Sequence, residues 1–212
     1  MIDLDSYYLS LSGFMIDLKI LEKYKANKVS FKKGEIIFSE NEKAIFYYQI
    51  ITGKVKMCYY SKDGNEVLLG IFSDNDSFGE PAIFGGFAYP ANAEAIEDTI
   101  LYELHYDNLK ELLKNNFEVH LQVTALLSQR LKYKSLIMKE ISTHDPKHRI
   151  MTLLDHYKKN VYKKANSEIF KIPFTRQQIA NMTGLTVETV IRAIKDLEHE
   201  NVLKITSGKI FL

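Results

Sequence analysis

Short apolar and alternating segments, separated by turn residues, follow one another from about Val29 to Leu104. The segments are VSFKKGEIIFSE, AIFYYQIITGKVKMCYY, SKDGNEVLLGIF and TILYELHY, with Gly34, Gly53, Gly64 and Gly70 between or within them. Segments of this kind bounded by glycine predict β-strands. Lys62-Asp63-Gly64-Asn65 predicts a tight hairpin, because glycine adopts a positive φ at no steric cost. Many short strands at regular spacing indicate a sandwich or a jelly-roll barrel.

Two helical patterns flank this β-region. The stretch from about Ser6 to Tyr24 has apolar residues at helical intervals, which predicts a helix packed on the strands. The stretch from about Asn116 to Ser142 is a longer helical run without Gly or Pro. Its apolar positions Leu127, Leu131, Met138 and Ile141 form one seam at spacings of 4, 7 and 3, with Lys134 where a further apolar residue is expected.

An apolar seam on a long helix requires another helix to cover it. The sequence pattern contains no second helix of this length. We therefore predict a homodimer in which residues 116–142 pair with their copy about a two-fold axis. The alternative is that the seam packs on the β-domain of its own chain.

The segment His144-Asp145-Pro146 ends or bends the long helix, because proline disfavours helical backbone at the residue before it. Proline suits the first turn of a new helix, which Asp145 can cap. We therefore expect a hinge here. The predicted regions are a β-domain at 1–115, a dimerisation helix at 116–142 and a C-terminal domain at 143–212. The last region is expected to hold a helix from about Pro146 to Lys164, the short strand IFKIPF and a final hairpin turning at Ser207-Gly208.

The stretch TRQQIANMTGLTVETVIRAIKDLEHENVL, from Thr175, predicts two short helices joined at Gly184. Thr175 and Gln178 form a capping box for the first helix, and Thr186 can cap the second. The apolar positions of the second helix are Val190, Ile194 and Leu197. This is the pattern of a helix-turn-helix, whose second helix places its N-terminal half in the major groove of DNA. The candidate DNA-contacting residues are Thr175, Arg176, Thr186, Val187, Glu188, Thr189, Arg192 and Lys195.

Glu188 and Arg192 lie one turn apart on this second helix. Glu188 can accept a hydrogen bond from a cytosine amino group, and Arg192 can donate two to a guanine edge. Each good contact of this kind contributes about 1 to 3 kcal/mol of discrimination between bases. The alternative is an ordinary intrahelical pair, which stabilises a helix by only about 0.2 to 0.5 kcal/mol. The capped preceding helix and the downstream hairpin favour base recognition.

The charge distribution agrees with this interpretation. From Thr143 onward the chain has twelve Lys and Arg against seven Asp and Glu, whereas residues 1–142 have sixteen against twenty. A basic end on an acidic body is typical of a protein that approaches phosphate with that end. No long apolar run and no basic-then-apolar N-terminus occur, so we expect no membrane span, no secretory signal and a cytoplasmic location.

The order of these parts resembles the CRP/FNR family of bacterial transcription regulators over nearly the whole chain. KKGEIIF, ITGKVKM, DGNEVLLGIF and SFGEPAIFG resemble the family's cyclic-nucleotide-type sensor domain, and TRQQIANMTGLTVETVIRAIKDLE resembles its recognition motif. The resemblance implies an α+β fold, with an eight-stranded jelly roll, a dimerisation helix and a winged helix-turn-helix. It also implies a homodimeric activator that contacts RNA polymerase and is not an enzyme.

The resemblance places Glu188 and Arg192 on the family's base-reading glutamate and arginine. It implies double-stranded DNA with TGA-type half-sites in an inverted repeat. Val187 departs from the family pattern, because the cAMP-responsive members have a third base-contacting arginine there. The flanking base preference is therefore open.

In the sensor domain, Glu80 matches the family glutamate that binds the ribose hydroxyl, but Pro90-Ala91 occupies the position of the Arg-Ser pair that binds the cyclic phosphate. A buried phosphate without that arginine lacks a counter-charge worth on the order of several kcal/mol. We expect an unidentified effector other than cAMP, and a cyclic-nucleotide-responsive regulator is the alternative. Lys134 can meet an anionic ligand or fix the helix register. The pocket candidates are Phe78, Gly79, Glu80, Pro90, Ala91, Lys134 and Ser135.

No cofactor is predicted. Cys58 is the single cysteine, so it forms no disulfide or iron–sulfur site by itself, and we interpret it as a small buried hydrophobe rather than a redox centre. Haem ligation by one histidine is an alternative, although His105, His120, His144, His148 and His156 show no metal-binding spacing. A cupin-like enzyme would need several histidines on the β-barrel, and residues 29–104 contain none.

Overall fold

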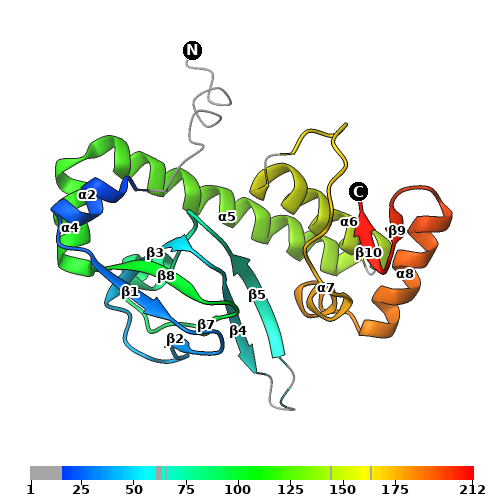
Figure 1. Cartoon of the computed structure of the whole chain (residues 1–212), viewed down its shortest axis with the longest axis horizontal. Helices are drawn as coiled ribbons and strands as arrows, with labels where there is room; N and C mark the ends of the chain where they lie inside the picture. Colours follow the sequence, from blue (N-terminus) through cyan, green and yellow to red (C-terminus); the bar gives the residue numbers. More distant parts are fainter. Residues whose placement is uncertain (1–15, 61–63, 65, 144, 163) are drawn as a thin grey trace. The chain divides into compact units, whose positions relative to one another are not determined.

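A computed structural model describes residues 16–60, 64, 66–143, 145–162 and 164–212 of this chain (Figure 1). The chain divides into two compact units, the first ending at Leu127 and the second beginning at Ser128. The division falls inside one helix, α5 (Phe117–Thr143). The predicted α+β class is confirmed by the element order, whereas the boundaries expected at residues 115 and 142 stay predictions.

The first unit is built on two antiparallel sheets of four strands each. One sheet has the order β1 (Asn27–Phe31), β8 (Thr99–His105), β3 (Phe46–Thr52) and β6 (Ser77–Phe78). The other has the order β2 (Ile36–Phe38), β7 (Asn92–Ala95), β4 (Val55–Tyr60) and β5 (Glu66–Phe72). This arrangement confirms the predicted eight-stranded roll.

The hairpin between β4 and β5 is formed, because Tyr60 pairs with Glu66 at its end. Within the expected turn, Gly64 has a φ of +78°, the left-handed region that glycine adopts without strain. The other turn residues, Lys62, Asp63 and Asn65, lie outside the described residues.

A core between the two sheets is made by side chains that alternate inward along the strands. Its fully or nearly fully buried members include Phe38, Tyr48, Ile50, Val55, Phe78, Tyr89 and Leu101. Cys58 of β4 is also fully buried and free, as expected for a small apolar residue. Burial raises the pKa of its thiol.

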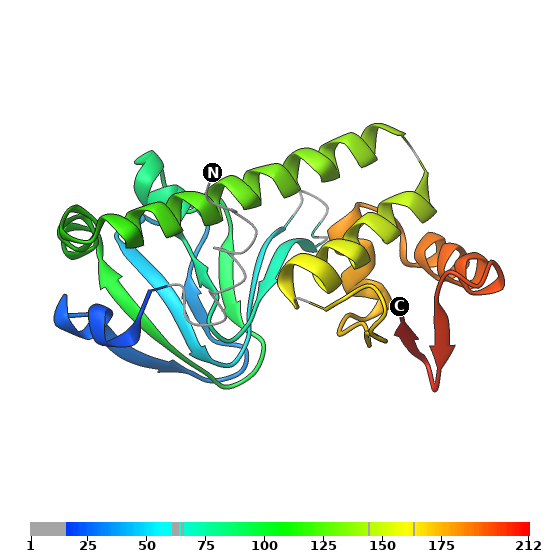
Figure 2. The same cartoon turned by 90° about the horizontal axis from the view of Figure 1, so that it is seen from above.

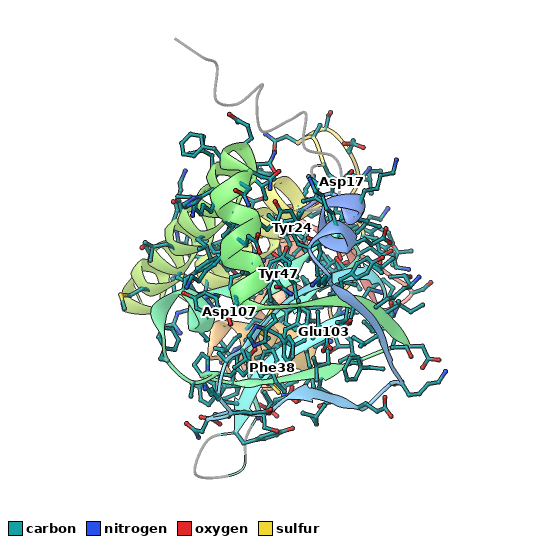
Figure 3. The ribbon with its side chains drawn as sticks, turned by 90° about the vertical axis from the view of Figure 1, so that its left-hand side faces the viewer. Asp17, Tyr24, Phe38, Tyr47, Glu103 and Asp107 are labelled. Atoms are coloured by element: carbon teal, nitrogen blue, oxygen red, sulfur yellow. The ribbon has the colours of Figure 1, made fainter. Side chains whose placement is uncertain are left out.

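A second core lies between the first sheet and the helices α2 (Leu18–Lys23), α4 (Tyr106–Asn115) and the start of α5. Tyr47 of β3 is fully buried in it, and Figure 3 labels this residue near the helices. The buried Gln49 accepts hydrogen bonds at Oε1 from the Tyr47 hydroxyl (2.6 Å) and the Ile16 backbone N–H (2.9 Å). These bonds attach the segment before α2 to the sheet. Of the helix expected from Ser6 to Tyr24, the structure shows α2. Residues 1–15 lie outside the described residues.

The second unit contains α6 (Pro146–His156), a π-helical turn η1 (Tyr157–Val161), α7 (Arg176–Thr183), α8 (Val187–His199) and the hairpin β9 (Lys204–Thr206) and β10 (Lys209–Phe211). Asp145 caps α6 as predicted, accepting a hydrogen bond from the Lys147 backbone N–H at 3.0 Å. Figure 2 shows the hairpin beside α8.

Two expectations for this unit need correction. The helix expected to reach Lys164 gives way to the π-turn at Tyr157, where the Tyr162 N–H donates to the Tyr157 carbonyl at 2.8 Å, a five-residue step. The segment IFKIPF is an edge segment rather than a full strand. The Ile172 N–H donates to the Ile210 carbonyl of β10, and Phe170 pairs with Leu212 directly after β10. Pro173 follows without an N–H to extend the ladder.

We expect Gly53→Ala to lower the free energy of unfolding of the first unit by about 3 kcal/mol, because overpacking and left-handed strain add. Gly53 has a φ of +111°, and an added Cβ would lie 2.4 Å from Thr99 Oγ1 and 2.6 Å from Thr99 Cα. Urea unfolding followed by tyrosine fluorescence measures the loss. The matched control is Gly34→Ala, which has a φ of +90° but meets no atom within 4 Å and should lose only about 1 kcal/mol. Equal losses at the two positions would contradict the steric argument.

Candidate nucleic-acid interface and sensor pocket

The two helices of the helix-turn-helix begin at the predicted caps. The Gln178 backbone N–H donates to Thr175 Oγ1 at 3.1 Å, and the Thr175 N–H donates to Gln178 Oε1 at 2.9 Å, so the capping box is confirmed. Gly184 has a φ of +66° and ends α7. The Thr189 N–H donates to Thr186 Oγ1 at 3.2 Å, which confirms Thr186 as the cap of α8. Local hydrogen bonds therefore set the start of both helices.

Helix α8 has one apolar and one polar face. The buried face consists of Val190, Ala193, Ile194 and Leu197, which includes the three predicted positions. The opposite face forms a shallow depression lined by Glu188, Ile191, Arg192, Lys195 and Asp196. The predicted residues Glu188, Arg192 and Lys195 are thus gathered on one exposed surface. Val187 is half-buried at the start of the helix.

The side chains of Glu188 and Arg192 make no polar contact with other described side chains of the second unit. Among the described residues, no hydrogen bond or ion pair joins their side chains to each other or to another side chain, although i,i+4 pairs such as Lys164–Glu168 are formed elsewhere. The intrahelical pair considered as an alternative is therefore not formed in this structure. Both side chains are exposed and can hydrogen-bond to a ligand.

The hairpin β9–β10 is attached to the start of α7. Arg176, predicted to contact DNA, donates from Nη1 to the Gly208 carbonyl oxygen at 2.7 Å. The turn itself has Ser207 at a φ of +48° and Gly208 at +73°. Arg176 therefore holds the turn of the β9–β10 hairpin in place. The exposed Lys209 is the first residue of β10.

A buried lysine supports the same hairpin. Lys158 is 5% exposed, and its Nζ donates to the carbonyl oxygens of Asn166 (3.1 Å) and Leu212 (3.2 Å). Desolvating an ammonium is costly unless acceptors replace its water. The two carbonyl groups supply that replacement and hold the end of the chain against the π-turn. The sequence gives no signal for the burial of Lys158, because it is one of two adjacent lysines, Lys158 and Lys159.

The sensor candidate Phe78 belongs to an aromatic cluster inside the roll. Its ring stacks on Tyr48 with 5.2 Å between centroids, and Phe38 stacks on Tyr89 at 3.7 Å. The Tyr89 hydroxyl donates to the Phe46 carbonyl oxygen at 3.0 Å, which satisfies its polar group. Burial raises the pKa of Tyr48 and of Tyr89. The interior between the sheets is thus occupied by the chain's own rings.

The remaining candidates of the first unit surround helix α3 (Glu80–Gly85). Gly79, at a φ of +86°, precedes the helix, and Glu80 opens it with a fully buried side chain. Ala91 is fully buried, while Pro90 is exposed. Among the described residues of this unit, Glu80 is the one buried charged side chain, and no Lys or Arg is buried. Glu80 therefore places an acidic group, and not a basic one, in the interior of the first unit.

The last two candidates, Lys134 and Ser135, lie on α5 in the second unit. The Ser135 hydroxyl donates to the Leu131 carbonyl oxygen at 3.0 Å. Lys134 is exposed as a residue, yet desolvation of its ammonium, and then the like charge of Arg130, lower its pKa. A lysine with a lowered pKa loses its proton more readily than an ordinary surface lysine.

Both units match known families. Residues 28–116 match the cyclic nucleotide-binding domain, and residues 148–212 match the Crp-like helix-turn-helix domain. A CRP-like cAMP-activated global transcriptional regulator of Mycobacterium tuberculosis is 26% identical over 185 residues, covering 87% of this chain and 83% of that protein. A fumarate and nitrate reduction regulatory protein of Yersinia pestis is 24% identical over 190 residues, which cover 89% of this chain and 76% of that protein. The structure of FixK2 from Bradyrhizobium japonicum matches with a TM-score of 0.72 and 26% identity. The match covers 88% of this chain and 92% of the FixK2 chain.

This chain belongs to the CRP/FNR family. The predicted resemblance is confirmed, and with it the assignment as a transcription regulator with a DNA-binding helix-turn-helix rather than an enzyme. In the described part of the chain, no helix is both long and apolar enough to cross a membrane.

The long helix of this CRP/FNR regulator has two apolar stripes. Val119 and Val123 are buried in the core of the first unit, and Leu127 is half-buried against it. An exposed stripe, at spacings of 4 and 3, consists of Phe117, Leu121, Thr124, Ser128, Leu131, Ser135 and Met138. Of the predicted seam, Leu131 and Met138 are therefore on the exposed stripe, while Leu127 packs on its own chain. The side chain of Ile141 lies outside the described residues.

Among the described histidines of the CRP/FNR regulator, His105, His120 and His156 contact neighbouring groups. His105 caps α4, accepting at Nδ1 from the Asp107 N–H at 3.3 Å, and His156 stacks on Tyr133 with 3.6 Å between centroids. His120 lies edge-on to Phe117, and His148 is exposed. His144 lies outside the described residues. Within the described ranges, no group of three or more His, Cys, Asp and Glu side chains could hold a metal ion.

Sequence reasoning missed Ile191 and Asp196 on the recognition surface. They follow Glu188 by three and eight residues, so helical spacing alone places them beside it.

Proposed function

We propose that this CRP/FNR regulator is a homodimer that recognises double-stranded DNA with TGA-type half-sites in an inverted repeat. The observation that carries the proposal is the exposed pair Glu188 and Arg192, one turn apart on a capped helix whose other face is buried. In the major groove, Glu188 accepts from a cytosine amino group and Arg192 donates to a guanine edge. Because each protomer binds one half-site, the same base contacts are made twice in the complex.

The exposed stripe of α5 supports the homodimer. Leu131 and Met138 are 68% and 74% exposed, although both are large apolar side chains. The same stripe contains the small hydroxyl residues Thr124, Ser128 and Ser135. Such hydroxyls can hydrogen-bond within the helix, and Thr124 donates to the His120 carbonyl oxygen at 2.9 Å. Hydroxyls bonded in this way can enter an interface without losing a partner. A second copy of α5 would cover the stripe in the manner of a parallel coiled coil.

An effector other than cAMP is proposed to control the dimer. The support is the roll interior, where Tyr89 stacks on Phe38, together with Pro90-Ala91 at the position where cAMP-binding members of the family have the Arg-Ser pair. The Mycobacterium tuberculosis relative is named as cAMP-activated, so a cyclic nucleotide is the competing effector. In this proposal the regulator acts in the cytoplasm and contacts RNA polymerase, as the family resemblance implies, and it carries no haem.

For DNA recognition, we expect Arg192→Ala to lower affinity for a TGA inverted-repeat duplex by about tenfold or more per half-site, because one guanine loses its contact. Its affinity for a scrambled duplex should stay nearly unchanged. Lys209→Ala is the matched basic control and should weaken both duplexes alike, lowering the slope of log affinity against log salt by about 1 per protomer. Fluorescence anisotropy over a salt series measures both. Wild-type binding no tighter to the TGA duplex than to the scrambled one would refute the proposal.

For the dimer, we expect Leu131→Glu to convert the protein to a monomer, because two like charges would face each other in a desolvated seam. Sedimentation at several concentrations measures the change. Gln129→Glu adds the same charge at an exposed position off the stripe and should leave the dimer intact. A monomeric wild type, or a dimeric Leu131→Glu variant, would count against the proposed interface.

For the effector, we expect calorimetry with cAMP and with cGMP to show no binding in the micromolar range. A cyclic phosphate buried near Glu80 would have no arginine to offset its desolvation, and Pro90-Ala91 cannot supply one. Micromolar affinity for either nucleotide would overturn this part of the proposal. It would leave the DNA-binding part untouched.

A further inference from the structure

A second pocket, separate from the ring-filled space between the sheets, opens on the first unit. Its volume is about 500 Å³, within the range of roughly 300 to 1,000 Å³ that is usual for small-molecule sites. Its lining comes from three segments: the loop before β3, the end of α3 with the loop that follows it, and the junction of β8 and α4, where Figure 3 labels Asp107. None of the sensor candidates predicted from the sequence is among its described lining residues.

Backbone hydrogen bonds hold the walls of this pocket together. The Tyr106 N–H donates to the Ile45 carbonyl oxygen at 2.9 Å, which joins the start of α4 to the loop before β3. At the other end of that loop, the Asn41 N–H donates to the Tyr89 carbonyl oxygen at 2.8 Å, which joins the loop to the segment after α3. The pocket is therefore part of the fold, and no rearrangement is needed to open it.

Phe87 gives the pocket an exposed aromatic wall. Its side chain is 49% exposed, and a Cβ added at Gly85 would lie 2.1 Å from its Cε1 and 2.5 Å from its Cδ1. The ring therefore rests directly on the backbone of Gly85, where no other residue would leave room for it. With Ala44, Ile83 and Tyr106 it forms an apolar lining, which suits an aromatic ring of a ligand.

Two hydrogen-bond donors lie at the same pocket. Lys43 is exposed, and within the described ranges its ammonium forms no ion pair or hydrogen bond. His105 accepts at Nδ1 from the Asp107 N–H, so its Nε2 carries a proton whether the ring is neutral or charged. No described group accepts from Nε2. The Asp107 carboxylate lies 3.6 Å from Nδ1, at the opposite edge of the imidazole, which leaves the Nε2 edge for an acidic ligand.

We propose that this pocket binds a small aromatic carboxylate, which accepts hydrogen bonds from Lys43 and from Nε2 of His105 while its ring packs on Phe87. The inference does not depend on the proposed DNA recognition, because every lining residue belongs to the first unit. Ile83 lines the pocket and is buried in the same core as Val123 of α5. An occupant of the pocket therefore touches the packing on which the start of the long helix rests.

Calorimetry on the full-length protein tests the ligand class with phenylpropionate and naphthylacetate as probes. We expect saturable binding of at least one of these acids, in the millimolar range or tighter. Phenylpropionamide should bind about tenfold more weakly than phenylpropionate, because the charge that Lys43 meets is lost. Absence of saturable binding of both acids, or equal binding of the amide, would overturn the inference. Preferential binding of phenylethylamine would also overturn it, since Asp107 would then select a cation.

Variants of the lining test the location with the acid that binds. Lys43→Gln and Phe87→Ala should each lower its affinity about tenfold. Gly85→Ala keeps the Phe87 ring but displaces it, so the affinity should also fall.

The matched controls are Lys28→Gln and Phe84→Ala. Lys28 is an exposed lysine of β1, and Phe84 is 39% exposed on α3, but neither lines the pocket. Both variants should bind the acid as the wild type does, and equal losses in lining and control variants would overturn the assignment of the site. None of these measurements uses DNA, so a failure of the proposed function and a failure of this inference are distinguishable.

Discussion

The described residues of this chain bury one apolar stripe of the long helix α5 and leave a second one exposed, and the proposed assembly depends on that exposed stripe. Helix α5 has 27 residues and apolar side chains on more than one face. Val119 and Val123 are buried by the first unit, which leaves Leu131 and Met138 in water. Large apolar groups gain about 25 cal/mol for each Å² removed from water, so a second copy has a clear driving force for association. A two-fold pair of these helices would also supply two recognition helices, as an inverted repeat requires.

The first unit keeps the two-sheet frame of the family, and aromatic rings of its own chain fill the space between the sheets. Stacked pairs such as Phe38–Tyr89 occupy the space between the sheets, and each aromatic contact contributes about 0.5 to 1.5 kcal/mol beyond its buried area. A ligand that enters the roll must separate or rearrange these rings. Its differential affinity for the rearranged state would then set how far it can shift the protein between two conformations.

Helix α8 has a buried face that fixes it to its unit and an exposed face that carries Glu188, Arg192 and Lys195. Val190 and Ile194 fix the helix to its unit, and the cap at Thr186 sets where it begins. Once these contacts are made, the remaining side chains can face only outward. The surface so formed combines the charged residues Glu188, Arg192, Lys195 and Asp196 with the apolar Ile191.

The sequence alone determined the order of the elements, because period-two alternation, a helix without breakers and local caps are short-range signals. The capping box of Thr175 and Gln178 and the hairpin at Ser207-Gly208 are examples, since each depends on residues at most a few positions apart. Family motifs likewise identified the regulator from short segments of sequence.

Only the tertiary structure decided which face of α5 is covered, how Lys158 is buried and which rings fill the roll. Each of these depends on residues far apart in the chain, such as Phe38 and Tyr89, whose contact no local pattern encodes. Helical spacing could place Leu127 and Leu131 on one seam, but it could not show that the first packs on its own unit while the second stays exposed. The physical reason is that periodicity gives the direction of a side chain, whereas burial depends on what the rest of the fold places opposite it.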